Sequence, residues 1–195
     1  MKAAVQDVYG SPVVLRFEEI ELPPLGDHDV IVRVRAAGID AGVWHTTAGK
    51  PYLLRLFFGF RAPKQRIPGR DLAGQVVEVG AEVTRFRVGD DVFGTSLEGT
   101  FASFTRTSED RLVHKPANIS FEQAAAVPIS GCAALHGLRD AGRLRAGENV
   151  LVLGAGGGVG SFAVQIAVAL GATVTGDRNR SVQHVEGRFR AVTGR

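Results

Sequence analysis

The feature that most constrains the fold is a strand, a glycine-rich loop and a helix in residues 148–175. Residues 149–153 contain an uninterrupted apolar run from Val150 to Leu153, which is typical of a strand buried on both faces. Five glycines follow between positions 154 and 160. Residues 161–170 then predict a helix that ends at Gly171, and residues 172–175 predict a second strand. This order predicts a parallel β-α-β unit.

The glycine loop also predicts what this unit binds. In register, Ala155, Gly157 and Gly160 match the dinucleotide fingerprint G-x-G-x-x-G, with alanine in the first position. Glycines let the backbone approach a ligand closely, and the helix N-terminus offers free N–H groups to a pyrophosphate. A flexible glycine linker is the alternative, but apolar runs on both sides disfavour it. The predicted cofactor-binding residues of this Rossmann start are Gly154, Ala155, Gly156, Gly157, Gly158, Val159 and Gly160.

The sequence before this unit predicts two other kinds of structure. Short β-rich segments with Gly and Pro turns indicate an antiparallel, barrel-like domain. The predicted strands lie in residues 29–36, 73–80, 86–94, 101–104 and 111–115. Ser120 and Gln123 then form a capping-box pattern at the start of a helix, and a second helix is expected from Cys132 to Ala141. The fold class is therefore α/β plus β.

Charge and composition exclude several function classes. The pI is near 9.4, but residues 177–195 hold five arginines and two acidic residues, which account for the whole net charge of +3. The rest of the chain is neutral, so we expect no nucleic-acid partner. There is no run of about 18 apolar residues, so we expect no membrane partner. Cys132 is the only cysteine, and the first residues do not form a secretory signal, so we expect a cytoplasmic location.

Four motifs carry a resemblance to a known family. The glycine loop with its preceding strand resembles the quinone oxidoreductase signature of the medium-chain dehydrogenase/reductase superfamily. The others, in the family's order, are residues 68–74 (PGRDLAG), 88–94 (VGDDVFG) and 124–128 (AAAVP). The resemblance covers residues 1–176. It implies a GroES-like β domain at residues 1–118 and the start of a Rossmann domain at 119–176, with NADPH between them. It also implies hydride transfer to a quinone, an enone or another carbonyl substrate, and frequent homodimers.

Some members of this superfamily are zinc alcohol dehydrogenases, so the ligands must be compared. A catalytic zinc needs about three protein ligands. The position of the relatives' cysteine holds Asp40, and the position of their histidine holds Arg70, which repels a cation. The relatives' lobe of four closely spaced cysteines is missing. We therefore expect no zinc. The alternative of a zinc alcohol dehydrogenase is disfavoured, because this chain lacks the ligands that such an enzyme needs.

The resemblance implies that residues 40–52 line the substrate side. The expected catalytic residues are His45 and Tyr52, as possible proton donors, and Asp40, as a hydrogen-bonding group. The alternatives are structural: His45 as a satisfied polar group and Tyr52 as a surface turn residue. The relatives' threonine near the nicotinamide is replaced by Ala133. Ser130 or Cys132 would supply the compensating contact to the cofactor, and Ser130 is the predicted one. Cys132 is expected to pack within its helix.

The end of the chain departs from the family. Residues 177–195 lack helical periodicity and do not resemble the relatives. Codons chosen for Val182 onward and read one nucleotide later can encode a family-like sequence, so we hypothesise a frameshift near Gly176 and a truncated product. Resequencing the gene tests this hypothesis. An inactive remnant that acts at most as a binding module is then the alternative function. The segment that distinguishes NADP from NAD is also lost; taken literally, Asp177 would favour NAD.

Overall fold

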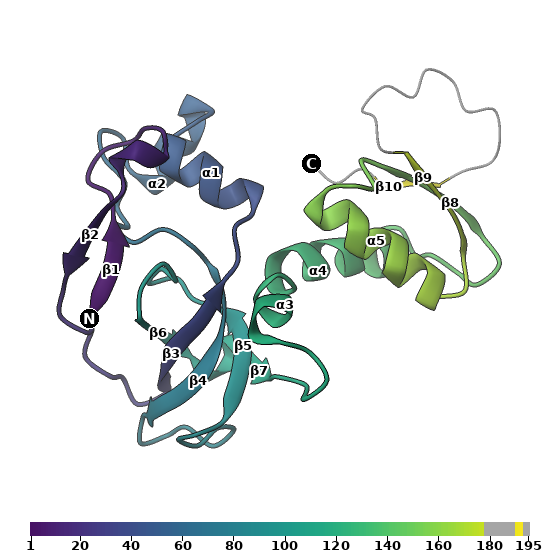
Figure 1. Cartoon of the computed structure of the whole chain (residues 1–195). Helices are drawn as coiled ribbons and strands as arrows, with labels where there is room; N and C mark the ends of the chain where they lie inside the picture. The colour runs from purple at the N-terminus through teal and green to yellow at the C-terminus, as the bar shows by residue number, and fades with distance from the viewer. Residues whose placement is uncertain (178–189, 193–195) are drawn as a thin grey trace. The chain divides into compact units, whose positions relative to one another are not determined.

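The computed structural model describes residues 1–177 and 190–192. The chain divides into two compact units, residues 1–128 and residues 129–195. Each unit has its own main sheet (Figure 1). The first sheet is antiparallel and the second is parallel, which confirms the predicted α/β plus β class.

The first unit is built on a five-stranded antiparallel sheet. In the order of the sheet, its strands are β6 (Phe104–Ser108), β3 (Asp29–Ala37), β4 (Asp71–Val79), β5 (Asp91–Thr95) and β7 (Leu112–His114). β3, β4 and β7 confirm the strands predicted at 29–36, 73–80 and 111–115. Large apolar side chains from four of the strands, joined by Phe86, make its core. These are Val30, Val32, Leu72, Val76, Phe86, Val92 and Leu112.

Two predicted strands differ from the structure. The first part of the segment at 86–94 is not a strand, because Arg87 N donates to Asp90 Oδ2 (3.0 Å) and closes a turn before β5. Phe86 nevertheless fills the core from this loop, so its apolar character did not indicate a strand. The strand predicted at 101–104 begins only at Phe104, as β6, and Ala102 keeps a single isolated bridge to Ala3.

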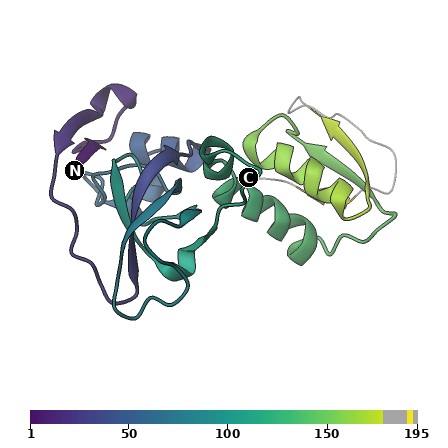
Figure 2. The same ribbon diagram turned by 60° about the horizontal axis from the view of Figure 1, so that its bottom comes forward.

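An N-terminal ribbon completes the β structure of this unit. β1 (Lys2–Val5) pairs antiparallel with β2 (Arg16–Glu19), and neither strand was predicted. The ribbon is tied to the following sheet by Ala4 N, which donates to Phe101 O (2.8 Å). Short helical segments connect the strands (Figure 2). They are η1 (Pro12–Val14), α1 (Ala41–Ala48), η2 (Tyr52–Leu54), α2 (Arg55–Phe58) and η3 (Glu109–Arg111).

The predicted capping box begins α3 (Phe121–Ala125). Ser120 Oγ accepts from Gln123 N (3.2 Å), and Gln123 Oε1 accepts from Ser120 N (2.9 Å). The helix packs on the sheet through Ala124 and Ala125, which share a buried cluster with Ala73. Because of this packing, α3 lies in the first compact unit, while the domain boundary expected after residue 118 stays a prediction.

The second unit contains the predicted β-α-β arrangement. α4 (Pro128–Leu135) begins at its proline and continues into the π-helical η4 (His136–Ala141). β8 (Asn149–Leu153) leads through α5 (Gly158–Ala169) to β9 (Thr173–Asp177), which pairs parallel with β8. β10 (Arg190–Val192) pairs parallel with the other edge of β8. The core lies between helices and sheet, with Ala134, Leu138, Val150, Val152, Ala163, Ala167 and Ala172 buried. The frameshift hypothesis falls mostly on residues outside those described.

Candidate functional site

The glycine loop is a tight turn that ends in the N-terminus of α5. Gly154 has φ 73°, in the left-handed region that favours glycine. Gly157 N donates to Gly154 O (2.9 Å), which closes the turn, and Gly157 is the N-cap of α5. The first N–H groups of a helix have no acceptor within it. The backbone N–H groups of the first turn of α5 and the positive end of its helix dipole therefore lie together at the end of the loop.

The glycines of this loop differ in what surrounds them. A Cβ built on Gly160 would lie 2.1 Å from Gly154 O, so only glycine lets the helix approach the loop this closely. A Cβ on Gly154 or on Gly156 would meet nothing within 4 Å. Gly160 thus serves packing, while Gly154 and Gly156 border open space. Open space beside a helix N-terminus fits the pyrophosphate of a dinucleotide.

Ser130 lies beside this loop, while its predicted contact to the cofactor stays a prediction. Its side chain is buried, and its Oγ is 3.2 Å from where a Cβ on Gly158 would stand. Cys132, which was expected to pack within the same helix, is exposed instead, so that prediction is wrong. The reason is helical geometry. Cys132 follows Ser130 by two positions, and side chains two positions apart on a helix point in nearly opposite directions.

Two residues that support the loop were not predicted. Ala155 N donates to Asp177 O (2.9 Å), which fastens the loop to the end of β9. A Cβ on Gly176 would lie 2.9 Å from Ala155 Cβ, so glycine there permits this close approach. The glycine that interrupts the run of β-branched residues in β9 was the available signal, because a glycine inside a strand often marks a close backbone contact.

The three predicted catalytic residues belong to the first unit and follow β3 in the chain. Asp40 is the N-cap of α1, and its Oδ1 accepts from Val43 N (2.8 Å). His45 lies within α1 and Tyr52 begins η2. Tyr52 is 66% exposed, and the Arg55 guanidinium lies 4.8 Å from the centre of its ring. Asp40 therefore has a structural role in the helix, and Tyr52 is a surface residue in this unit.

The hydrogen bond of His45 limits what its ring can do. Its Nδ1 lies 2.7 Å from the carbonyl oxygen of Lys50, which can only accept, so Nδ1 carries a proton. Nε2 is then an acceptor in the neutral ring and a donor only in the imidazolium. The ring also meets Trp44 edge to face, with centroids 5.0 Å apart. These contacts hold His45 in one orientation.

The residues at the relatives' zinc positions do not fit a catalytic zinc. One carboxylate oxygen of Asp40 is already an acceptor in the helix cap, and Arg70 is an exposed cation just before β4. Within residues 1–177 and 190–192, no three His, Cys, Asp or Glu side chains gather as a metal site would require.

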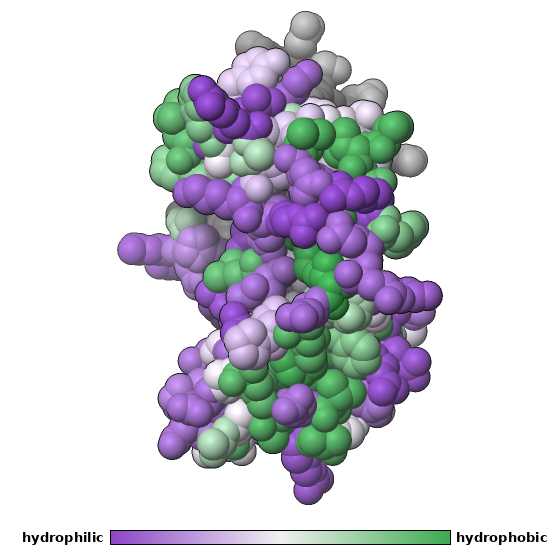
Figure 3. Space-filling view, turned by 90° about the vertical axis from the view of Figure 1, so that its left-hand side faces the viewer, coloured by the Kyte–Doolittle hydropathy of each residue, from purple (hydrophilic) through white to green (hydrophobic). Residues whose placement is uncertain are grey.

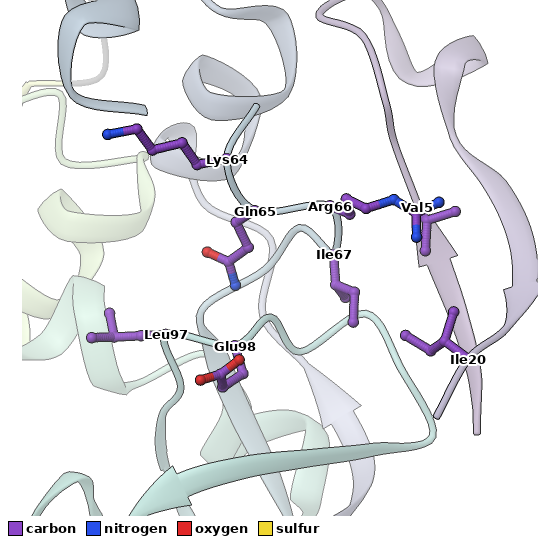
Figure 4. A pocket seen from close by; sticks show the side chains of 8 residues that line it. All are labelled: Val5, Ile20, Lys64, Gln65, Arg66, Ile67, Leu97 and Glu98. Atoms are coloured by element: carbon purple, nitrogen blue, oxygen red, sulfur yellow. The ribbon is translucent and has the colours of Figure 1, made fainter. Parts of the chain in front are cut away.

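The first unit also holds an open groove of about 470 Å³ (Figure 4). Its lining is half apolar and half polar: Val5, Ile20, Lys64, Gln65, Arg66, Ile67, Leu97 and Glu98. Two of its charged lining residues are already paired. Arg66 contacts Asp7 and Glu18, and Glu98 contacts Arg106 at 2.7 Å. The groove was not predicted from the sequence, because its residues come from four separate segments.

None of the helices in the described parts of the chain combines the length and the apolar character needed to cross a membrane.

Comparisons with known proteins agree with this geometry. Residues 26–117 match the model of the alcohol dehydrogenase GroES-like domain. The chain is 38% identical to a quinone oxidoreductase of Pseudomonas aeruginosa, over 86% of this chain and 50% of that protein. It is 35% identical to 2-methylene-furan-3-one reductase of Solanum lycopersicum, over 86% of this chain and 44% of that protein. The chain thus spans about half the length of these relatives.

Solved structures give the same result. The Escherichia coli quinone oxidoreductase complexed with NADPH matches with a TM-score of 0.79 at 30% identity, over 90% of this chain and 52% of that one. The CurK enoyl reductase matches with a TM-score of 0.82 at 31% identity, over 90% and 53%. With its GroES-like domain and its Rossmann start, the chain belongs to the medium-chain dehydrogenase/reductase superfamily, among its quinone oxidoreductase-like members.

Proposed function

We propose that this chain serves an NADPH-dependent oxidoreductase that reduces a quinone, an enone or another carbonyl substrate without zinc. The observation that carries the proposal is the glycine loop, with open space at Gly154 and Gly156 beside the N-terminus of α5. Relatives named quinone oxidoreductase and NADPH-dependent alkenal/one oxidoreductase support the reaction class. The single exposed cysteine suits the cytoplasmic location that we propose with it.

Residues of the second unit would bind the dinucleotide, and residues of the first unit would donate the proton. Backbone N–H groups of the loop, with Ser130 beside them, would hold the dinucleotide, which supplies a hydride when bound. His45 would donate a proton from Nε2 only as the imidazolium, because its Nδ1–H is engaged by Lys50 O. Tyr52 is the alternative donor, and Asp40 offers its second carboxylate oxygen as an acceptor.

The choice of dinucleotide is part of the proposal. The NADPH complex of a neighbour and the name of an enone-reducing relative support NADPH. Asp177 at the end of β9 supports NADH, because an acid there can accept from the ribose 2′-hydroxyl and repels a 2′-phosphate. Calorimetric titration of the chain with NADPH and with NADH compares them directly, and we expect NADPH to bind more tightly.

Turnover is tested with the same protein. We expect NADPH oxidation, followed by absorbance, in the presence of a small quinone or enone, unchanged by a zinc chelator. The kcat values of His45→Gln and Tyr52→Phe should be compared. Substitution of the residue that donates the proton should lower kcat, and substitution of the other residue should leave kcat near that of the unsubstituted chain. Binding of NADPH without any turnover would reject the enzyme and leave a binding module. Loss of activity with chelator would reject zinc independence.

A further inference from the structure

The exposed large apolar side chains of the first unit are concentrated in one short stretch. Residues 50–64, here called the 50–64 segment, contain η2, α2 and the turns around them. Six of its apolar side chains are at least 40% exposed within nine consecutive residues. They are Tyr52, Leu53, Leu56, Phe57, Phe58 and Phe60. Figure 3 shows one face of the molecule, on which hydrophobic side chains reach the surface between hydrophilic ones. Large contiguous apolar patches are rare on soluble monomers and mark contact surfaces.

The segment is held in place, so its exposure is a property of the folded unit. Arg55 Nε donates to Gly49 O (2.9 Å), and its guanidinium lies 4.5 Å from the ring centre of Tyr9. Tyr9 Oη donates to Gly59 O (2.7 Å), and Lys64 N donates to Phe58 O (2.8 Å). Side chains presented on a fixed frame lose little further entropy when they meet a partner.

The charge of the segment identifies the kind of partner. It contains four cations, Lys50, Arg55, Arg61 and Lys64, and no acidic residue. In the described part of the chain, Lys50, Arg61 and Lys64 take part in none of the ion pairs. The acids Asp7 and Glu18 are engaged by Arg16 and by Arg66, which lies just beyond the segment. Three of the four cations of the segment are therefore exposed and free of ion pairs with described residues, while Arg55 is held by Gly49 O and the Tyr9 ring.

Aromatic and leucine side chains beside free lysines and arginines suit the interface of an anionic bilayer. Rings and aliphatic chains enter the boundary between headgroups and acyl chains, while the cations meet the lipid phosphates and carboxylates. A second copy of the chain suits this surface less. A two-fold contact would bring four cations of one copy against the same four of the other.

We propose that the 50–64 segment docks the protein on the surface of an anionic lipid bilayer. The expectation of no membrane partner came from the lack of a spanning segment, and docking at the surface is a different mode of contact. The proposal does not depend on the hydride-transfer function, because it concerns lipid binding by the first unit alone.

Vesicle sedimentation with the whole chain tests this proposal. We expect binding to phosphatidylcholine vesicles that contain phosphatidylserine, little binding to phosphatidylcholine alone, and weaker binding at high salt. The double variant Arg61→Gln/Lys64→Gln should bind roughly twentyfold more weakly, since each cation near the surface contributes about fivefold. The double variant Phe57→Ser/Phe60→Ser should lose about tenfold or more.

Matched controls separate the segment from general effects. Val13 and Phe17 are both 90% exposed in the same unit, so Val13→Ser/Phe17→Ser removes apolar surface elsewhere and should bind like the original chain. Arg35→Gln/Arg145→Gln removes two exposed cations elsewhere and should lose less than threefold. As a second measurement, the emission of Trp44, the only tryptophan, should shift to the blue on anionic vesicles.

Three outcomes would overturn the proposal. The first is no binding to anionic vesicles, and the second is equal loss in the control variants. The third is a concentration-dependent dimer in analytical ultracentrifugation that Phe57→Ser/Phe60→Ser abolishes, because a second copy would then be the occupant.

Discussion

Alanine at two positions of the glycine loop should separate its packing role from its binding role. In Gly160→Ala the new methyl carbon would stand 2.1 Å from Gly154 O and 2.9 Å from Ala155 Cα. Both atoms belong to the backbone, so α5 and the loop must move apart. Overpacking of this kind costs up to about 3 kcal/mol. The higher helix propensity of alanine offsets up to about 1 kcal/mol of this cost, so the free energy of unfolding of the second unit should fall by about 2 kcal/mol.

Hydrogen exchange is the suitable assay, because it reports the stability of each segment by itself. A loss of about 2 kcal/mol should raise exchange of the most protected amides of β8 and α5 roughly thirtyfold. Amides of β3 and β4, in the other unit, serve as the internal reference. The reasoning is refuted if Gly160→Ala exchanges like the original chain in β8 and α5.

Gly156→Ala is the matched control. Its methyl group meets nothing within 4 Å, and Gly156 is not among the residues with positive φ. We therefore expect exchange to change by less than about twofold, since substitutions without a clash stay within about 0.5 kcal/mol. The same methyl group would occupy the space proposed for the pyrophosphate, so affinity for NADPH should fall about tenfold or more. Unchanged affinity would contradict the proposed cradle.

Three further substitutions test the packing, a helix cap and an ion pair. Leu138→Ala empties a fully buried position and should destabilise the second unit by about 3 kcal/mol, measured by urea unfolding followed by circular dichroism. Ser120→Ala removes the capping box of α3 and should cost about 1 kcal/mol, measured as a lower Tm of the first unit; an unchanged Tm would contradict the role of the cap. The guanidinium of Arg139, and then His136, lower the pKa of Asp140 from 3.8 to about 2. Its ion pairs therefore stabilise the fold above pH 3.8 and are lost as the pH falls toward 2, so Asp140→Asn should lower the urea midpoint at neutral pH but not at pH 2.

Local patterns predicted the second unit better than the first. β8 was predicted to the residue, because Val150, Leu151 and Val152 form an apolar run between a glycine turn and a glycine loop. The ribbon of β1 and β2 was missed, because Arg16–Glu19 shows no period of two and its pairing depends on distant residues. The π-helical turn at His136–Ala141 also has no sequence signal that we recognise.

The candidate site was predictable in its residue types but not in its contacts. The fingerprint placed the loop glycines, yet it did not distinguish Gly160, which packs, from Gly156, which borders open space. The sequence left His45 open between a structural and a functional role, and its bond to Lys50 O depends on how the chain turns after α1. Such three-dimensional proximity is set by the fold and cannot be read from spacing.

The bond between Ala4 and Phe101 has a consequence for how the protein is made. β1 leaves the ribosome well before its bonding partners on the sheet side, which lie about a hundred residues later in the chain, at 101–103. Ala3 and Val5 must therefore wait, unburied, until that stretch has been synthesised. The β-α-β unit needs only neighbours that follow within some thirty residues. The first unit, although synthesised first, is thus the one whose completion depends on distant chain, and we expect β1 to be the last strand to join its fold.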